Sequence, residues 1–165
     1  MPGRVQTYTD PFQHALIAAA VVAPLGRRVV PTAVSVALAI DLDHAVAARS
    51  VRVRDTTALS TRPRTHSLVT AAGAAALIGA RRGPLHGWAA FAGLVSHFLH
   101  DAGDRAAPTP LLWPFASARQ LGRRPQIIGT VALALASLAI SRATAGGATS
   151  RDVDGGGGTA PPRTA

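Results

Sequence analysis

The sequence predicts an all-α protein: an antiparallel bundle of four to five short apolar helices, embedded in or associated with a membrane. Alanine, leucine and valine dominate five stretches, none of which alternates apolar and polar residues as a half-buried strand does. Breaks rich in glycine, proline and arginine separate these stretches. The stretches are residues 12–25, 29–48, 65–80, 85–100 and 127–140.

Each stretch carries signals of its own. The first ends at Gly26, which two arginines follow, and the third ends before Gly83 and Pro84. The second contains a valine-rich part, residues 29–36, that favours a strand by propensity alone, but no hairpin signal accompanies it. The fourth begins after the Gly-Pro pair, and the fifth follows the proline-rich connection 102–126.

The length of 165 residues suits one domain with a core of its own. This helical domain is expected to cover residues 1–142. Beyond it, glycine, threonine, serine and proline dominate the composition. Such a segment buries too little apolar surface to offset the entropy of ordering it, so residues 143–165 are predicted to be a disordered tail.

The composition excludes some classes of site and partner. Because the chain has no cysteine, disulfides and thiolate zinc sites are excluded, and any metal must be held by nitrogen and oxygen atoms. The formal net charge of +9 suits either nucleic acid or anionic lipid. Aromatic residues are only 4% of the chain, which argues against a nucleic-acid binder. The mean hydropathy of +0.24 favours lipid.

Membrane insertion is predicted from the arginines more than from the length of the stretches. A spanning helix needs about 20 apolar residues, and four of the five stretches supply only 14 to 16. Arginines concentrate in the connections 49–64 and 102–126. By the positive-inside rule, these connections of a membrane-inserted chain are expected to lie on the cytoplasmic side.

Histidines and aspartates mark the ends of the first four stretches. The first stretch begins near His14, and the third begins near His66. The second ends with Asp41, Asp43 and His44, and the fourth ends with His97 and Asp101. In helices that run up and down, these four ends lie at one end of the bundle. Imidazoles and carboxylates in apolar surroundings are costly to desolvate unless they are paired or bound to a cation. The placement therefore predicts a metal site.

Two of these groups differ in how strongly they indicate a metal. Asp41, Asp43 and His44 place three ionisable groups in four positions at the expected C-terminus of a helix, where the dipole opposes carboxylates. A bound cation would reverse that penalty, which favours a metal. His97 and Asp101 lie one helical turn apart, and alone this pair is more typical of a simple hydrogen bond.

The motifs resemble, in their order and spacing, the YdjM-type membrane-bound metal-dependent hydrolases. The resemblance covers about residues 10–115 and implies a multi-pass helical fold, related to zinc phospholipase C and P1-type nucleases, whose bundles hold metals with His and Asp. It rests on His14, Asp41-Leu-Asp-His44, Arg62-x-x-Thr-His66-Ser, Ser96-His97-x-x-x-Asp101 and Pro110-Leu-Leu-Trp-Pro114. The chain departs from the pattern at Thr61, where the family tends to have histidine.

By position, the resemblance implies seven metal ligands. It also places Arg62 nearby as an anion contact, and Asp43 and Arg62 are the expected catalytic residues. The implied ligands are His14, Asp41, Asp43, His44, His66, His97 and Asp101.

The expected activity is hydrolysis of an ester by metal-activated water, with a phosphoester of small-molecule or lipid origin as the substrate. Ligation by nitrogen and oxygen favours Zn²⁺, with Mn²⁺ and Mg²⁺ as alternatives. Arg62 or Arg64 would bind a phosphate. The alternative is a non-catalytic multi-pass membrane protein whose polar cluster serves assembly or ion binding. The sequence indicates no oligomeric state.

Overall fold

The computed structural model describes residues 10–103 and 107–154, and within these ranges the chain is helical apart from its connections. A single isolated β-bridge joins Thr109 and Arg119 in the described residues. The predicted all-α class is therefore confirmed. The elements are α1 (Asp10–Val22), η1 (Ala23–Leu25), α2 (Val30–Ala39), α3 (Leu42–Ala48), α4 (Val53–Thr57), α5 (Leu68–Arg82), α6 (Pro84–Gly103) and α7 (Arg123–Asp154).

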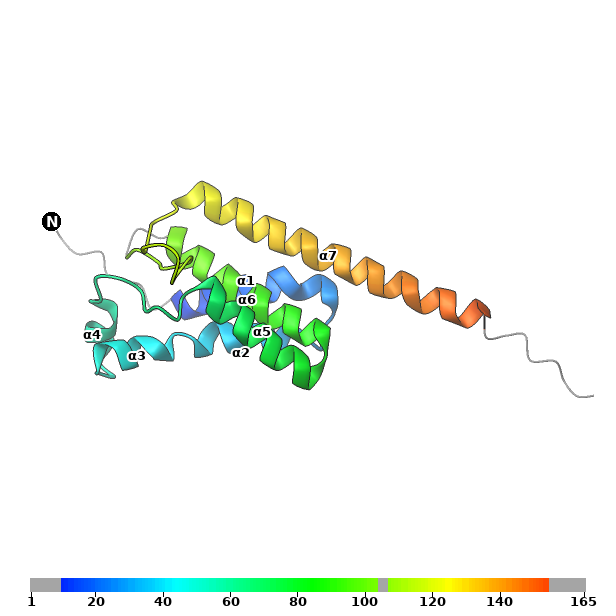
Figure 1. Cartoon of the computed structure of the whole chain (residues 1–165), viewed down its shortest axis with the longest axis horizontal. Helices are drawn as coiled ribbons and strands as arrows, with labels where there is room; N and C mark the ends of the chain where they lie inside the picture. The colour runs from blue at the N-terminus through cyan, green and yellow to red at the C-terminus, as the bar shows by residue number, and fades with distance from the viewer. Residues whose placement is uncertain (1–9, 104–106, 155–165) are drawn as a thin grey trace, which may run out of the picture.

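Helix α6 is the centre of the bundle and packs against α1, α2, α5 and α7 (Figure 1). It carries the longest run of buried residues, many of them alanine or glycine. Small side chains let the neighbouring backbones come close: a Cβ on Gly93 would lie 2.6 Å from the carbonyl oxygen of Ala33 in α2. The bundle is thus held together mainly by close helix packing around α6.

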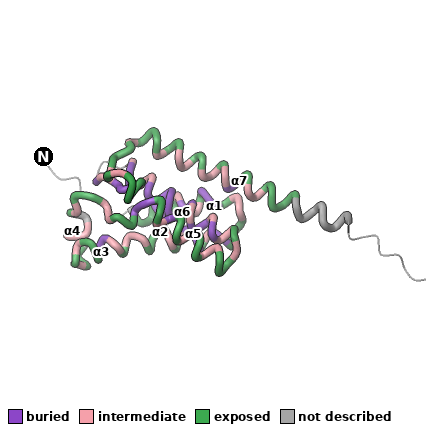
Figure 2. Tube along the Cα trace, viewed as in Figure 1, coloured by how far each residue is buried: buried purple, intermediate pink, exposed green. Residues whose placement is uncertain are grey.

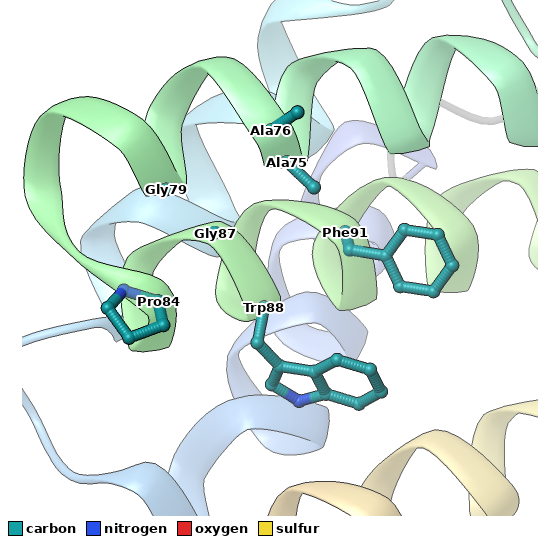
Figure 3. Close-up of a pocket in the computed structure, with 7 residues that line it drawn as sticks. All are labelled: Ala75, Ala76, Gly79, Pro84, Gly87, Trp88 and Phe91. Carbon is teal, nitrogen blue, oxygen red and sulfur yellow. The ribbon is translucent and has the colours of Figure 1, made fainter.

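A second close approach joins α6 to α5. A Cβ on Gly87 would lie 2.9 Å from the Cα of Gly79. Beside this crossing is an open apolar pocket, in the half of α6 away from His97 and Asp101 (Figure 3). The pocket is lined by Ala75, Ala76, Gly79, Pro84, Gly87, Trp88 and Phe91.

The four predicted helix ends meet at one end of the bundle, as the up-and-down arrangement requires. Helices α1 and α5 begin there, and α3 and α6 end there (Figure 1). The connections on either side of α4 and before α7 lie at the same end, which is called the polar end below.

Two features differ from the expected helices. The stretch 29–48 is not one helix: it breaks at Ile40 and Asp41, between α2 and α3. Helix α7 continues past residue 142, where the disordered tail was expected to begin, because the segment after that point still contains alanines that favour helix. Residues 155–165 of the expected tail lie outside the described residues, and the division into domain and tail stays a prediction.

Among the described residues, two segments are long and apolar enough to cross a membrane: Val30–Ala48, which comprises α2, the break and α3, and Arg123–Gly146. The second is longer than predicted, and only 6% of its most apolar part is buried in the bundle. Its exposed side chains include Ile128 and Leu135. Most of the described part of α7 is exposed or intermediate (Figure 2). Such a surface suits contact with lipid, in agreement with the expected membrane association.

The close contact at Gly93 generates a stability prediction. Gly93→Ala should destabilise the bundle by about 1–3 kcal/mol, because the new methyl group meets the α2 backbone and not a movable side chain. The measurement is the midpoint of thermal loss of helical circular dichroism in detergent.

Gly73→Ala in α5 is the matched control, since a Cβ there has nothing within 4 Å. It should stabilise the protein by about 0.5–1 kcal/mol, because glycine is a poor residue inside a helix. Equal midpoints for the two variants would contradict the packing described for α6.

Candidate metal centre

The break between α2 and α3 positions the acidic run. Asp41 is the N-terminal flanking residue of α3, Asp43 lies in its first turn and His44 is buried. The expectation that these carboxylates lie at a helix C-terminus was wrong, because the chain turns at Ile40 and begins a new helix. The dipole of α3 favours acidic groups at this position.

His66 reaches the same place from the connection before α5. Its backbone N–H donates to the carbonyl of Pro63 at 3.0 Å, and Ser67 next to it caps α5 by accepting from the N–H of Thr70. This capping fixes where the helix begins. The His66 ring is thereby held in the interior, fully buried.

The C-terminal part of α6 contributes His97 and Asp101, both buried and one turn apart. His14 of α1 lies beside them, with its ring stacked on that of His97 at a centroid separation of 3.7 Å. The structure therefore brings the seven predicted ligand residues to one place, from four separate parts of the chain.

Four of these residues are linked by close contacts between one atom of each. Oδ2 of Asp101 lies 3.3 Å from Nε2 of His66 and 3.3 Å from Nε2 of His97. Oδ1 of Asp41 lies 3.3 Å from Nε2 of His97 and 3.9 Å from Nε2 of His66. These atoms are called the four-atom cluster.

Three members of the four-atom cluster, Asp41, His66 and His97, place one ligand atom each close enough together to hold a divalent metal ion. Two ligand atoms that are each about 2.1 Å from a tetrahedral zinc ion lie about 3.4 Å apart, close to the observed separations. Nε2 of His66, Nε2 of His97 and Oδ2 of Asp101 are buried, and none of them makes a hydrogen bond within the described part of the chain. Buried polar atoms are normally satisfied, so a cation is the partner that this geometry suits.

Asp43 supports the cluster from behind His66. Its Oδ2 accepts from Nδ1 of His66 at 3.2 Å and from the hydroxyl of Thr65. Since a carboxylate can only accept, Nδ1 carries the proton and Nε2 is left to bind a metal. Thr65 had no predicted role, although it belongs to the motif that carries His66.

The same surroundings affect the ionisation of His66. Burial alone would lower the pKa of its imidazole, but the carboxylates of Asp101 and Asp43 outweigh this effect and raise the pKa above its usual value. A metal that binds at Nε2 therefore competes with a proton more strongly than it would at an ordinary histidine.

Arg62 contacts two of the predicted ligand residues. Its Nη2 lies 3.1 Å from Oδ1 of Asp101, and its Nη1 donates to Nε2 of His44 at 3.1 Å. Because a guanidinium cannot accept, His44 accepts at Nε2 and carries its proton on Nδ1, which lies 3.0 Å from Oδ1 of Asp43. These contacts use both nitrogens of His44, and the guanidinium is already engaged in the place where an anion contact was expected.

His14 belongs to a second, overlapping group. Its Nε2 lies 3.6 Å from Oδ1 of Asp101, the oxygen that also faces Arg62. His14, His97 and Asp101 could hold an ion together, and so could Asp43, His44 and His66. The seven residues thus form overlapping groups and not a single coordination sphere; their assignment as ligands stays a prediction.

Other histidines and serines of the bundle form hydrogen bonds away from the four-atom cluster. Nδ1 of His100 is 3.0 Å from the side-chain amide of Gln126 in α7, and His86 pairs with Thr32 at the opposite end of the bundle. Ser96 donates to the carbonyl of Gly93 within α6.

Comparison with known proteins gives one match. Residues 10–154 match the family model described as YdjM inner membrane protein. No curated protein and no solved structure matches the chain.

The four-atom cluster predicts stoichiometric metal. The purified protein should carry a divalent ion, measured by inductively coupled plasma mass spectrometry, and His66→Ala should lose it because one of four ligands is removed. Asp43→Asn should bind about 10–100-fold more weakly in a competition titration, because it only orients His66.

Each variant has a matched control. His86→Ala removes a histidine at the opposite end, and Asp55→Asn removes a carboxylate that bonds to Ser50, so both should keep the metal. Full retention of metal by His66→Ala would contradict the assignment of the cluster.

Arg62→Met should destabilise the metal-free protein by about 3–5 kcal/mol, since it leaves the buried Asp101 carboxylate without its guanidinium partner. Added Zn²⁺ should raise the thermal midpoint of this variant more than that of the parent, because the ion supplies the lost positive charge. An equal rise in both proteins would argue against an ion next to Asp101.

Proposed function

The chain belongs to the YdjM inner membrane protein family, and from this premise we propose that it is a metal-dependent hydrolase of the inner membrane. The proposed reaction is hydrolysis of an ester, with a phosphoester of small-molecule or lipid origin as the substrate. The observation that supports it best is the four-atom cluster of Asp41, His66, His97 and Asp101.

The donor set favours a particular kind of ion. Two imidazole nitrogens and two carboxylate oxygens, with no sulfur, suit Zn²⁺ best, and Mn²⁺ or Mg²⁺ are the alternatives. Such an ion supplies a Lewis acid and lowers the pKa of a water bound to it, which gives a nucleophile at neutral pH.

The chain's own residues hold the cluster and leave one side open. Asp43 and Thr65 fix the orientation of His66, while Arg62 occupies one oxygen of Asp101 and directs the other toward the cluster. The Asp41 side chain is 32% exposed, against 1% for Asp101. A substrate would therefore approach from the side of Asp41.

The best candidate for an anion contact is Arg64. It is exposed, it lies two residues before His66, and its guanidinium stacks over the Trp113 ring at 5.9 Å. Arg62, by contrast, already contacts Asp101 and His44. Arg64 could bind a phosphate oxygen without breaking an internal ion pair.

The proposed orientation follows from the arginines. The polar end carries eight described arginines, while the opposite end of the bundle has Arg27, Arg28, Arg81 and Arg82. With the two candidate spans, this distribution supports a multi-pass protein whose cluster faces the cytoplasm. The eight are Arg49, Arg52, Arg54, Arg62, Arg64, Arg119, Arg123 and Arg124.

The test is turnover by the purified full chain in lipid nanodiscs loaded with Zn²⁺, Mn²⁺ or Mg²⁺. A chromogenic phosphodiester and a carboxylic ester serve as probes. Hydrolysis should require the metal, stop with a chelator and fall at least about 100-fold in Asp41→Asn, which removes a ligand charge at the open side.

His86→Ala is the control and should hydrolyse the probes as the parent does, because His86 pairs with Thr32 far from the cluster. Stoichiometric metal with no hydrolysis of either probe would instead support the non-catalytic, ion-binding alternative.

A further inference from the structure

The connection between α6 and α7 forms a fixed loop at the polar end. Its backbone is paired where Thr109 and Arg119 exchange hydrogen bonds of 3.0 and 3.1 Å. The N–H of Leu68 donates to Leu111 at 2.9 Å, and the N–H of Leu121 donates to Ala102 at 2.8 Å. The part of the loop between these contacts, residues 111–115, is called the Trp113 loop.

The Trp113 loop carries apolar side chains outward. Phe115 is 87% exposed, Leu112 is 56% exposed and Trp113 is 37% exposed. Three large apolar residues within four positions are seldom left in water by a loop that its own hydrogen bonds hold in place. The exposed tip therefore indicates an apolar partner.

The described charged residues that lie over the loop or follow it in the sequence are positive. Arg64 lies over the Trp113 ring, Arg119 follows the loop, and Arg123 and Arg124 begin α7; all four are exposed. The sequence from residue 107 to residue 146 contains no Asp or Glu. The partner should accordingly combine an apolar interior with a negatively charged surface.

The position of the loop identifies that partner. The candidate span Arg123–Gly146 begins eight residues after Phe115, so a helix that crosses the membrane from Arg123 leaves the loop near the boundary between lipid and water. Tryptophan and arginine are the side chains that suit this boundary, and anionic headgroups attract arginines near it.

We infer that the Trp113 loop inserts its apolar tip into the headgroup region of an anionic bilayer, where Arg64, Arg119, Arg123 and Arg124 bind lipid phosphates. The loop is tied through Leu111 to the start of α5, next to His66, so lipid binding would also place the four-atom cluster at the membrane surface. The inference holds whether or not that cluster is catalytic.

The test uses the two tryptophans of the chain. Trp88→Phe leaves Trp113 as the sole reporter in the full-length protein. This variant is reconstituted in vesicles of equal phosphatidylglycerol and phosphatidylcholine, with bromine placed near the headgroup end of the acyl chains of one lipid or the other. Brominated phosphatidylglycerol should quench Trp113 at least about twofold more than brominated phosphatidylcholine.

Two charge variants separate local binding from overall charge. Arg119→Gln with Arg124→Gln should bring the ratio of the two quenching efficiencies close to one. Arg81→Gln with Arg82→Gln removes the same charge from exposed arginines at the other end of the bundle and should leave the ratio unchanged.

Three outcomes would overturn the inference. The first is equal quenching by both lipids in the parent, and the second is no quenching by either. The third is a change of Trp113 emission caused by short double-stranded DNA and not by vesicles, which would assign the basic end to nucleic acid.

Discussion

The polar end depends on the buried carboxylate of Asp101. A charge out of contact with water costs several kcal/mol unless it is paired with good geometry. Its Oδ2 faces His66 and His97, and its Oδ1 faces Arg62 and His14. These partners come from α1, from the connection before α5 and from α6. Burial of this one group therefore requires three parts of the chain to meet.

Close packing elsewhere in the bundle makes that meeting possible. Gly93 lets α2 approach α6, and Gly87 lets α5 approach it, so the helix ends arrive within hydrogen-bond distance of one another. The break at Ile40 brings Asp41 and Asp43 to the same place. In a continuous helix, Asp41 and Asp43 would lie on opposite faces, whereas after the break Asp41 faces His97 and Asp43 faces His66.

The sequence predicted the helices and their common end, because apolar stretches and the position of each polar group within them are local properties. It missed the break at Ile40, where neither glycine nor proline marks a turn. The role of Arg62 was also missed, because its contact with Asp101 joins residues far apart in the chain and depends on side-chain conformation. Family membership was predictable from the order of the motifs, while the ligand assignment and the hydrolase activity remain predictions.

The charge balance of the polar end limits what it can contain. Asp41, Asp43 and Asp101 face a single guanidinium, Arg62, which leaves a net formal charge of about −2 in a poorly solvated place. Either His66 and His97 both become imidazolium, or a divalent cation supplies the charge and both imidazoles stay neutral. The second solution also gives a partner to the buried Nε2 atoms, which make no hydrogen bond in the described structure. Both solutions meet the requirement for neutrality, and the requirement for satisfied polar atoms favours the cation.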